Sequence, residues 1–343
     1  MNRRPNLGLI VIVAAAALCV GPSALAQVDW TYQEVAVIPG PPGTWNSANH
    51  HLGKVIFDGT TYHMYMTGGQ TTLSWESAWA VGHWTSNSFD GPWDPDPDNP
   101  VLEVSAGQWD GFTIYNIAVY YDGSSFRMWY SATDSYLGIV RVGLATDADG
   151  DGDWTKHPGN PLPGLVPGGP GSWDDGGLSP NTVLFDGSVY GMWYTAVKDD
   201  GYYGDWSIGY AWSTDGLTWT KHPDPLLTPT EPWEGDNVYF AEVVPLGDGF
   251  AMWYSGLTPG YASIGYAVSP DGLHWGKHPA NPILPPQPGC DVVDSFSTYW
   301  DGVELHGWTN HCFEITRVTA PLELLFFDGF ESGSTSIWST TAP

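Results

Sequence analysis

The sequence is poor in positive charge. Lys and Arg together number 10, against 38 Asp and Glu, so the formal net charge is −28. A surface of this sign repels phosphate groups. The composition therefore argues against nucleic acid and anionic membranes as partners.

Long apolar runs are missing after the first 26 residues. The one apolar run, Leu7 to Val20, is too short to span a bilayer comfortably. It follows Arg3 and Arg4 and precedes small residues that end at Ala26, which is the order of a secretory signal peptide. We therefore expect a signal peptide over residues 1–26 and a secreted protein, extracellular or periplasmic. An uncleaved anchor is the disfavoured alternative.

Cysteine is also scarce. Cys19 lies in the expected signal peptide, which leaves only Cys290 and Cys312 in the mature chain. An even pair in an exported protein most simply forms a disulfide. We expect Cys290 and Cys312 to be bridged.

No long segment has the 3.6-residue apolar period of a helix. The chain is instead rich in aromatic residues and in turn formers, with 20 Trp, 18 Tyr, 43 Gly and 29 Pro. Short runs of Val, Ile, Tyr and Trp end at Asp-Gly pairs, which predicts an all-β protein of strands and hairpins.

The runs belong to a repeat. The phrases "DGDWTKHP", "DGLTWTKHP" and "DGLHWGKHP" close three units, and Trp45, Trp109, Trp173 and Trp233 open four units at intervals of 64, 64 and 60 residues. Radial repetition of such antiparallel meanders gives a β-propeller. Residues after Cys290 form a divergent fifth unit that lacks its outer strand. We therefore predict a five-bladed propeller of four-stranded blades over residues 27–320, closed by the N-terminal strand Trp30 to Ile38.

Strings such as "MWYSA" and "SIGYAWSTDGLTWTKHPDPLL" resemble the five-bladed propellers of the glycoside hydrolase family 43, 32 and 68 superfamily. The resemblance implies a sugar pocket on the propeller axis. It also implies three carboxylates, with an Asp from each of the first two blades and an acid Glu from the third. This chain departs from that pattern, because its first inner stretch "WNSANHHLGKVIF" contains no carboxylate and its third blade has no Glu.

The departures from the repeat supply the candidate catalytic residues. Glu242 stands within an apolar strand, "NVYFAEVVP", where other units have neutral residues. Burial raises the pKa of such a carboxyl, as a general acid requires. We predict Glu242 as the acid, with Asp175 or Asp294 as its partner; a Glu that merely hydrogen-bonds a neighbouring blade is the alternative.

Polar residues near the expected axis are candidates for sugar binding. Asn49, His50 and His51 replace the first-blade Asp. The two His are candidates to hold a metal, to orient a substrate hydroxyl or to act as the base, and a hydrogen-bonded pocket lining is favoured over metal ligation. The other candidates are Asp110, Asn116 and Asn181. Asp110 recurs as a Trp-Asp pair, so a structural role in the repeat competes with sugar binding.

A calcium loop and a tail complete the predictions. "DADGDGD" places Asp147, Asp149 and Asp151 as in the opening of a calcium loop, but Pro158 stands where the closing Glu belongs. An extended acidic turn is the alternative, and no cofactor is required. Residues 321–343 resemble the "DGFESG…W" tails of exported proteins and are either a disordered terminus or a sorting signal.

Two classes of function remain open. One is a secreted glycoside hydrolase-like enzyme acting on polysaccharide or oligosaccharide through an axial pocket. The other is a propeller that binds carbohydrate or another surface without catalysis. We expect carbohydrate as the partner and the protein to be a monomer.

Overall fold

The computed structural model describes residues 30–71, 78–136, 138–152, 154–199, 204–246, 248–300 and 304–321. The expected signal peptide and the tail after Pro321 lie outside these residues. Within them the protein is all-β, as predicted, with one short 3-10 helix at Pro232–Glu234. No helix in this part of the chain is long and apolar enough to span a membrane.

Four antiparallel groups follow the order of the repeat. The first sheet contains β2 (Asn49–Phe57), β3 (Tyr62–Gly69), β4 (Ala80–Ser86) and β5 (Asp94–Pro95). The second contains β6 (Thr113–Tyr121), β7 (Phe126–Thr133), β8 (Arg141–Asp147) and β9 (Thr155–Lys156).

The next two groups form one eight-stranded sheet, because Trp206 and Asn237 make a single parallel pair between them. One group contains β10 (Gly177–Phe185), β11 (Tyr190–Val197), β12 (Trp206–Ser213) and β13 (Thr220–Lys221). The other contains β14 (Asn237–Leu246), β15 (Gly249–Thr258), β16 (Tyr261–Ser269) and β17 (Gly276–Lys277).

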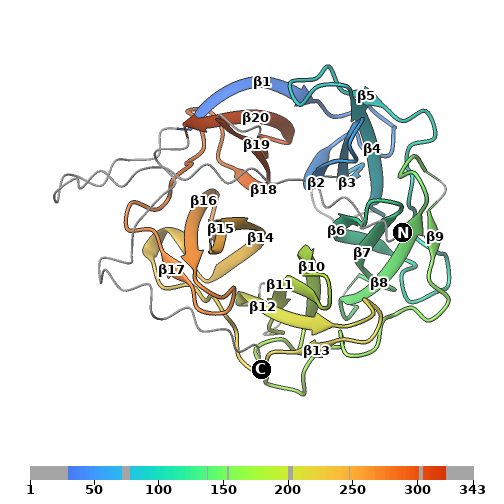
Figure 1. Cartoon of the computed structure of the whole chain (residues 1–343), viewed down its shortest axis with the longest axis vertical. Helices are drawn as coiled ribbons and strands as arrows, with labels where there is room; N and C mark the ends of the chain where they lie inside the picture. Colours follow the sequence, from blue (N-terminus) through green and yellow to red (C-terminus); the bar gives the residue numbers. More distant parts are fainter. Residues whose placement is uncertain are drawn as a thin grey trace, which may run out of the picture.

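The last sheet joins the two ends of the described chain. It contains β18 (Val293–Trp300), β19 (Glu304–His311), β20 (Glu314–Pro321) and β1 (Thr31–Val37), and β1 pairs antiparallel with β20. The predicted pairing of the N-terminal strand with the last unit is therefore present. Figure 1 shows the strand groups arranged around a common centre, with β2, β6, β10, β14 and β18 nearest to it.

Hydrophobic clusters fill the interfaces between successive groups. Each cluster takes residues from two neighbouring groups; one packs Trp129 of β7 against Trp219, and another packs Trp253 of β15 against Phe296 of β18. Burying aromatic side chains on this scale is a large part of the hydrophobic stabilisation. The abundance of Trp and Tyr is thus mostly explained by packing between sheets.

The repeated phrase has a structural reason. Its Lys lies on the short outer strand and reaches an acid that follows the opening Trp, in the pairs Asp110–Lys156, Asp174–Lys221 and Glu234–Lys277. Asp58, Asp122 and Asp186 cap the Asp-Gly turns through backbone N–H groups two and three residues ahead. The recurring acids of the repeat therefore hold the fold together.

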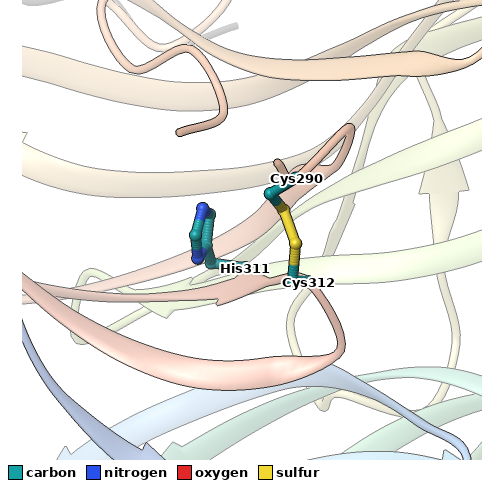
Figure 2. A group of neighbouring side chains, drawn as sticks. All are labelled: Cys290, His311 and Cys312. Carbon is teal, nitrogen blue, oxygen red and sulfur yellow. A yellow bond between two sulfur atoms is a disulfide. The ribbon is translucent and has the colours of Figure 1, made fainter. Parts of the chain in front are cut away.

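The predicted disulfide joins Cys290 to Cys312, with Cα atoms 5.6 Å apart. Figure 2 shows the bridge beside His311 at the end of β19. Because each sulfur is bonded to the other, these three residues do not offer a metal site despite their proximity.

Thiol titration of the denatured, unreduced protein is expected to find no free thiol in the mature chain, because both of its cysteines are bridged. The same titration after reduction should find two, which serves as the control. Two thiols before reduction would contradict the bridge.

Candidate functional site

Glu242 lies at the centre of the molecule and joins strands from four groups. It sits on β14 just after a β-bulge and is 2 % exposed. Its Oε1 is 2.5 Å from Lys54 Nζ of β2 and accepts a hydrogen bond from Thr298 N of β18 at 3.1 Å. Its Oε2 accepts from Thr182 Oγ1 of β10 at 3.3 Å. A buried charge is costly unless it is paired and hydrogen-bonded, and this carboxylate is both.

Lys54, the partner of Glu242, is not among the residues predicted from the sequence. It is the only Lys or Arg within the five inner strands as the structure describes them, and it pairs with the only Glu in those strands. The same departure from the repeat that identified Glu242 would have identified Lys54. A cation within the strand "HLGKVIF" is as unusual as an anion within "YFAEVVP". Each charge is tolerated in its strand because it is paired with the other.

A second group of residues lies near the starts of the inner strands β2, β14 and β18, with one residue of β19 that pairs with β18. We call His51, Tyr239, Phe240, Asp294 and Asn310 the strand-start cluster. Asp294 is 6 % exposed; Asn310 Nδ2 donates to its Oδ1 at 2.8 Å and Tyr239 Oη donates to its Oδ2 at 3.3 Å. The structure thus brings the predicted residues His51 and Asp294 into one cluster from opposite ends of the sequence.

The two titratable groups of the cluster are pushed toward their neutral forms. Burial raises the pKa of Asp294, an effect that the nearby His51 and the hydrogen bonds from Asn310 and Tyr239 oppose. Burial also lowers the pKa of His51, against the opposing charge of Asp294. Paired groups with displaced pKa values are typical of acid and base catalysts, although structural networks also produce them.

Aromatic rings surround the cluster. The His51 ring lies 4.9 Å from that of Trp79 and 5.1 Å from that of Phe240, and Tyr239 contacts Trp206 at 5.2 Å. Trp79 is fully buried, whereas His51, Phe240 and Trp206 are half-buried. Half-buried aromatic faces of this kind suit the apolar faces of sugar rings.

Backbone bulges shape the cluster. Phe240 has φ 52° and Ser295 has φ 46°, and each lies at a register shift in its strand. Left-handed backbone in residues other than Gly costs on the order of 1–3 kcal/mol and concentrates at functional sites. Bulges re-aim side chains next to active sites, and here they flank Tyr239 and Asp294.

The remaining polar candidates lie deeper or elsewhere. Asn116 and Asn181 line a space of about 10 Å³ beside Glu242, where Asn116 Nδ2 donates to Pro180 O and Asn181 Oδ1 accepts from Thr195 Oγ1. Asn49 and His50 are buried in β2, and His50 points to the opposite face of the strand from His51. Burial, reinforced by His51, lowers the pKa of His50 to about 4.

Two predicted carboxylates take part in other contacts. Asp175 accepts hydrogen bonds from Gly171 N and Asp199 N, which lower its pKa, and no contact with Glu242 is found among the described residues. Asp110 is buried against Lys156 Nζ at 2.6 Å and Tyr130 Oη at 3.1 Å. Of the acids considered from sequence, only Asp294 is brought into the strand-start cluster.

A cavity of about 190 Å³ lies at the other end of the inner strands. Lys54, Tyr120 and Thr182 are among its lining residues, together with the ends of β2 and β10. Lys54 thus lines this cavity as well as pairing with Glu242, whereas no residue of the strand-start cluster lines it.

The comparisons with known proteins agree with the fold. No family model matches the chain. It is 29 % identical over 138 residues to acid beta-fructofuranosidase AIV-18 of Capsicum annuum, covering 38 % of this chain and 21 % of that protein. It is 25 % identical over 241 residues to an uncharacterized protein of Mycobacterium tuberculosis, covering 67 % and 74 %. The chain thus spans about a fifth of the fructofuranosidase it matches.

Solved structures match over most of the chain. A thermostable family-43 glycoside hydrolase superposes with a TM-score of 0.61 at 20 % identity, covering 84 % of this chain and 91 % of that one. A glycosyl hydrolase from Bacteroides ovatus gives a TM-score of 0.64 at 13 % identity, covering 87 % and 95 %. The predicted resemblance is confirmed at the level of the fold: the chain has a propeller-like fold similar to that of a family-43 glycoside hydrolase, and part of its sequence is similar to a beta-fructofuranosidase.

Proposed function

We propose that this protein is a secreted glycoside hydrolase-like propeller that acts on oligosaccharide or polysaccharide at the strand-start cluster. The strand groups would be five blades of residues 27–320, closed by β1, with residues 1–26 removed and 321–343 as a tail. The observation that carries the proposal is the electrostatic interaction between a buried carboxyl, Asp294, and His51, beside half-buried aromatic rings. Burial shifts the pKa of each of the two groups toward its neutral form. The fold alone does not confer this function.

We assign proton donation to Asp294 rather than to Glu242. Glu242 is ion-paired with Lys54, whereas no cation of this kind is paired with Asp294 among the described residues, so the Glu242 carboxylate is already engaged as the partner of a cation. Asp294 has a raised pKa and retains a small exposed area. Its proton would pass to the glycosidic oxygen as the bond between that oxygen and the anomeric carbon breaks.

His51 would supply the base. Water attacks the anomeric carbon while the neutral imidazole takes its proton, so that the leaving group gains one proton and His51 gains another. With Asp294 as the acid and His51 as the base, hydrolysis inverts the configuration of the anomeric carbon, because the base activates water instead of forming a covalent intermediate. Phe240 and Trp206 would hold the sugar by their faces.

Carbohydrate binding without cleavage is the second candidate. It is favoured by the absence of a carboxylate from β2 and by the ion pair that occupies Glu242. Incubation with a panel of plant and microbial glycans, read for both released sugar and retained protein, separates the two functions. Release supports the hydrolase, retention without release supports the binding protein, and neither outcome on any glycan would contradict both.

If the protein hydrolyses glycans, its pH profile should carry the signatures of both groups. A raised pKa keeps Asp294 protonated to higher pH than an ordinary Asp, so kcat/KM should fall as pH rises through that raised value. A lowered pKa keeps His51 neutral to lower pH than an ordinary His, so the acidic limb should lie below the usual His range. A profile with an acidic limb at an ordinary His pKa, about 6.5, would contradict the assignment of His51.

A further inference from the structure

The loop after β8 differs from its counterparts in one residue that the fold does not require. In the third and fourth groups the corresponding strand ends in Ser213 and Ser269, which are buried. Each serine hydroxyl accepts hydrogen bonds from the backbone N–H groups two and three residues ahead. In the second group this position is Asp147.

Asp147 makes the same turn with only one of its oxygens. Its Oδ1 accepts from Asp149 N at 3.1 Å and Gly150 N at 3.2 Å, as the serine hydroxyls do. The rest of the loop is also equivalent, because Gly150 O accepts from the preceding group just as Gly216 O does. The carboxylate therefore brings a second oxygen and a negative charge that the turn does not need.

That second oxygen is buried without a partner. Asp147 is 6 % exposed, and its Oδ2 has no hydrogen-bond partner among the described residues. Leaving a buried charged oxygen unpaired is costly. A structural explanation of Asp147 therefore accounts for Oδ1 and leaves Oδ2 unexplained.

Two more carboxylates lie beside that of Asp147. Asp147, Asp149 and Asp151 each offer one oxygen, and these three atoms lie within 4.8 Å of one another. In the third group the serine donates to the following acid, Ser213 Oγ to Asp215 Oδ1 at 2.9 Å, but a carboxylate at 147 has no proton to donate to Asp149. The loop also carries Asp151 at the position that Leu217 occupies in the third group and Leu273 in the fourth, so the third carboxylate is not part of the repeat.

We propose that Asp147, Asp149 and Asp151 bind a calcium ion at the end of β8. Oxygen ligands only, two of them on exposed and adaptable side chains, suit a hard cation with a flexible shell. Water and backbone carbonyls would complete the shell. Because Tyr65 of β3 donates to Gly150 O at 2.7 Å, the ion would also stabilise the contact between the first two groups.

The test is a calorimetric titration of the mature full-length protein with Ca²⁺ after treatment with a chelator. We expect one site with a Kd of about 10⁻⁴–10⁻³ M, the range of extracellular calcium modules. Asp147→Ser introduces the residue found at this position in the third and fourth groups. The variant should therefore have the melting temperature of the parent when both are measured in chelator, and it should bind calcium at least tenfold more weakly. Asp149→Asn, in an exposed position, should weaken binding in the same way and serves if the first variant does not fold.

The matched control is Asp215→Asn, which removes one charge from the equivalent loop of the third group. It should bind calcium like the parent. Absence of binding by the parent up to about 10 mM, ten times the weak end of that range, would overturn the site. Parent-like calcium binding by both Asp147→Ser and Asp149→Asn would overturn it as well. So would an equal weakening by Asp215→Asn, because calcium binding would then depend on the total negative charge and not on this loop.

Discussion

Lys54→Met is expected to lower the free energy of unfolding by about 3–5 kcal/mol, the usual cost of removing one partner of a buried ion pair. The substitution keeps the length of the side chain but leaves the Glu242 carboxylate with two threonines and no cation at the centre of the molecule. Denaturant unfolding monitored by Trp fluorescence measures the loss.

Two controls separate charge from packing. The double variant Lys54→Met with Glu242→Gln removes both charges and should recover most of the loss, because no uncompensated charge remains. Lys198→Met breaks an exposed pair with Asp205 and should cost under about 1 kcal/mol. A single variant as stable as the parent would show that the pair does not hold the inner strands together.

Asp294→Asn is expected to lower kcat on a cleaved glycan by about 10²–10⁴-fold, the usual contribution of a general acid. The amide keeps the shape of the side chain and can still meet Asn310 and Tyr239, but it has no proton to transfer to the leaving oxygen. Rates on substrates with good and poor leaving groups measure the effect, which should be larger for the poor ones.

Asp175→Asn is the matched control for this prediction. Asp175 is also a carboxylate predicted as catalytic, but it accepts hydrogen bonds from the backbone of loops and is not part of the strand-start cluster. It should cleave at the parent rate. Parent-like cleavage by Asp294→Asn would remove Asp294 from the mechanism and return the role of acid to Glu242, which Glu242→Gln would then test.

The fold could be predicted because the same pattern of strands and turns recurs in successive units of the sequence. The Asp-Gly turns, the outer strand marked by "TKHP" and the missing strand of the last unit are all local patterns, so the pairing of β1 with β20 followed from them. The disulfide followed from the count of cysteines. Boundaries such as the short outer strands depend on hydrogen bonds that only the folded chain defines.

The site could be predicted only in part. Departure from the repeat found Glu242 and His51, but their partners lie far along the chain: Lys54 is 188 residues from Glu242. A single sequence carries no signal for which of several acids approaches a given residue across the centre of a ring. Asp175 and Asp294 were therefore equivalent candidates until the inner strands placed only Asp294 beside His51 and Tyr239.

The most direct measurement is a crystal structure of Asp294→Asn with a bound glycan taken from the panel. The account predicts a sugar ring against Phe240 and Trp206, with its glycosidic oxygen within hydrogen-bond distance of residue 294 and His51 on the opposite side of the anomeric carbon. A sugar bound in the cavity beyond Lys54, or on the outer face of the sheets with the strand-start cluster untouched, would contradict it.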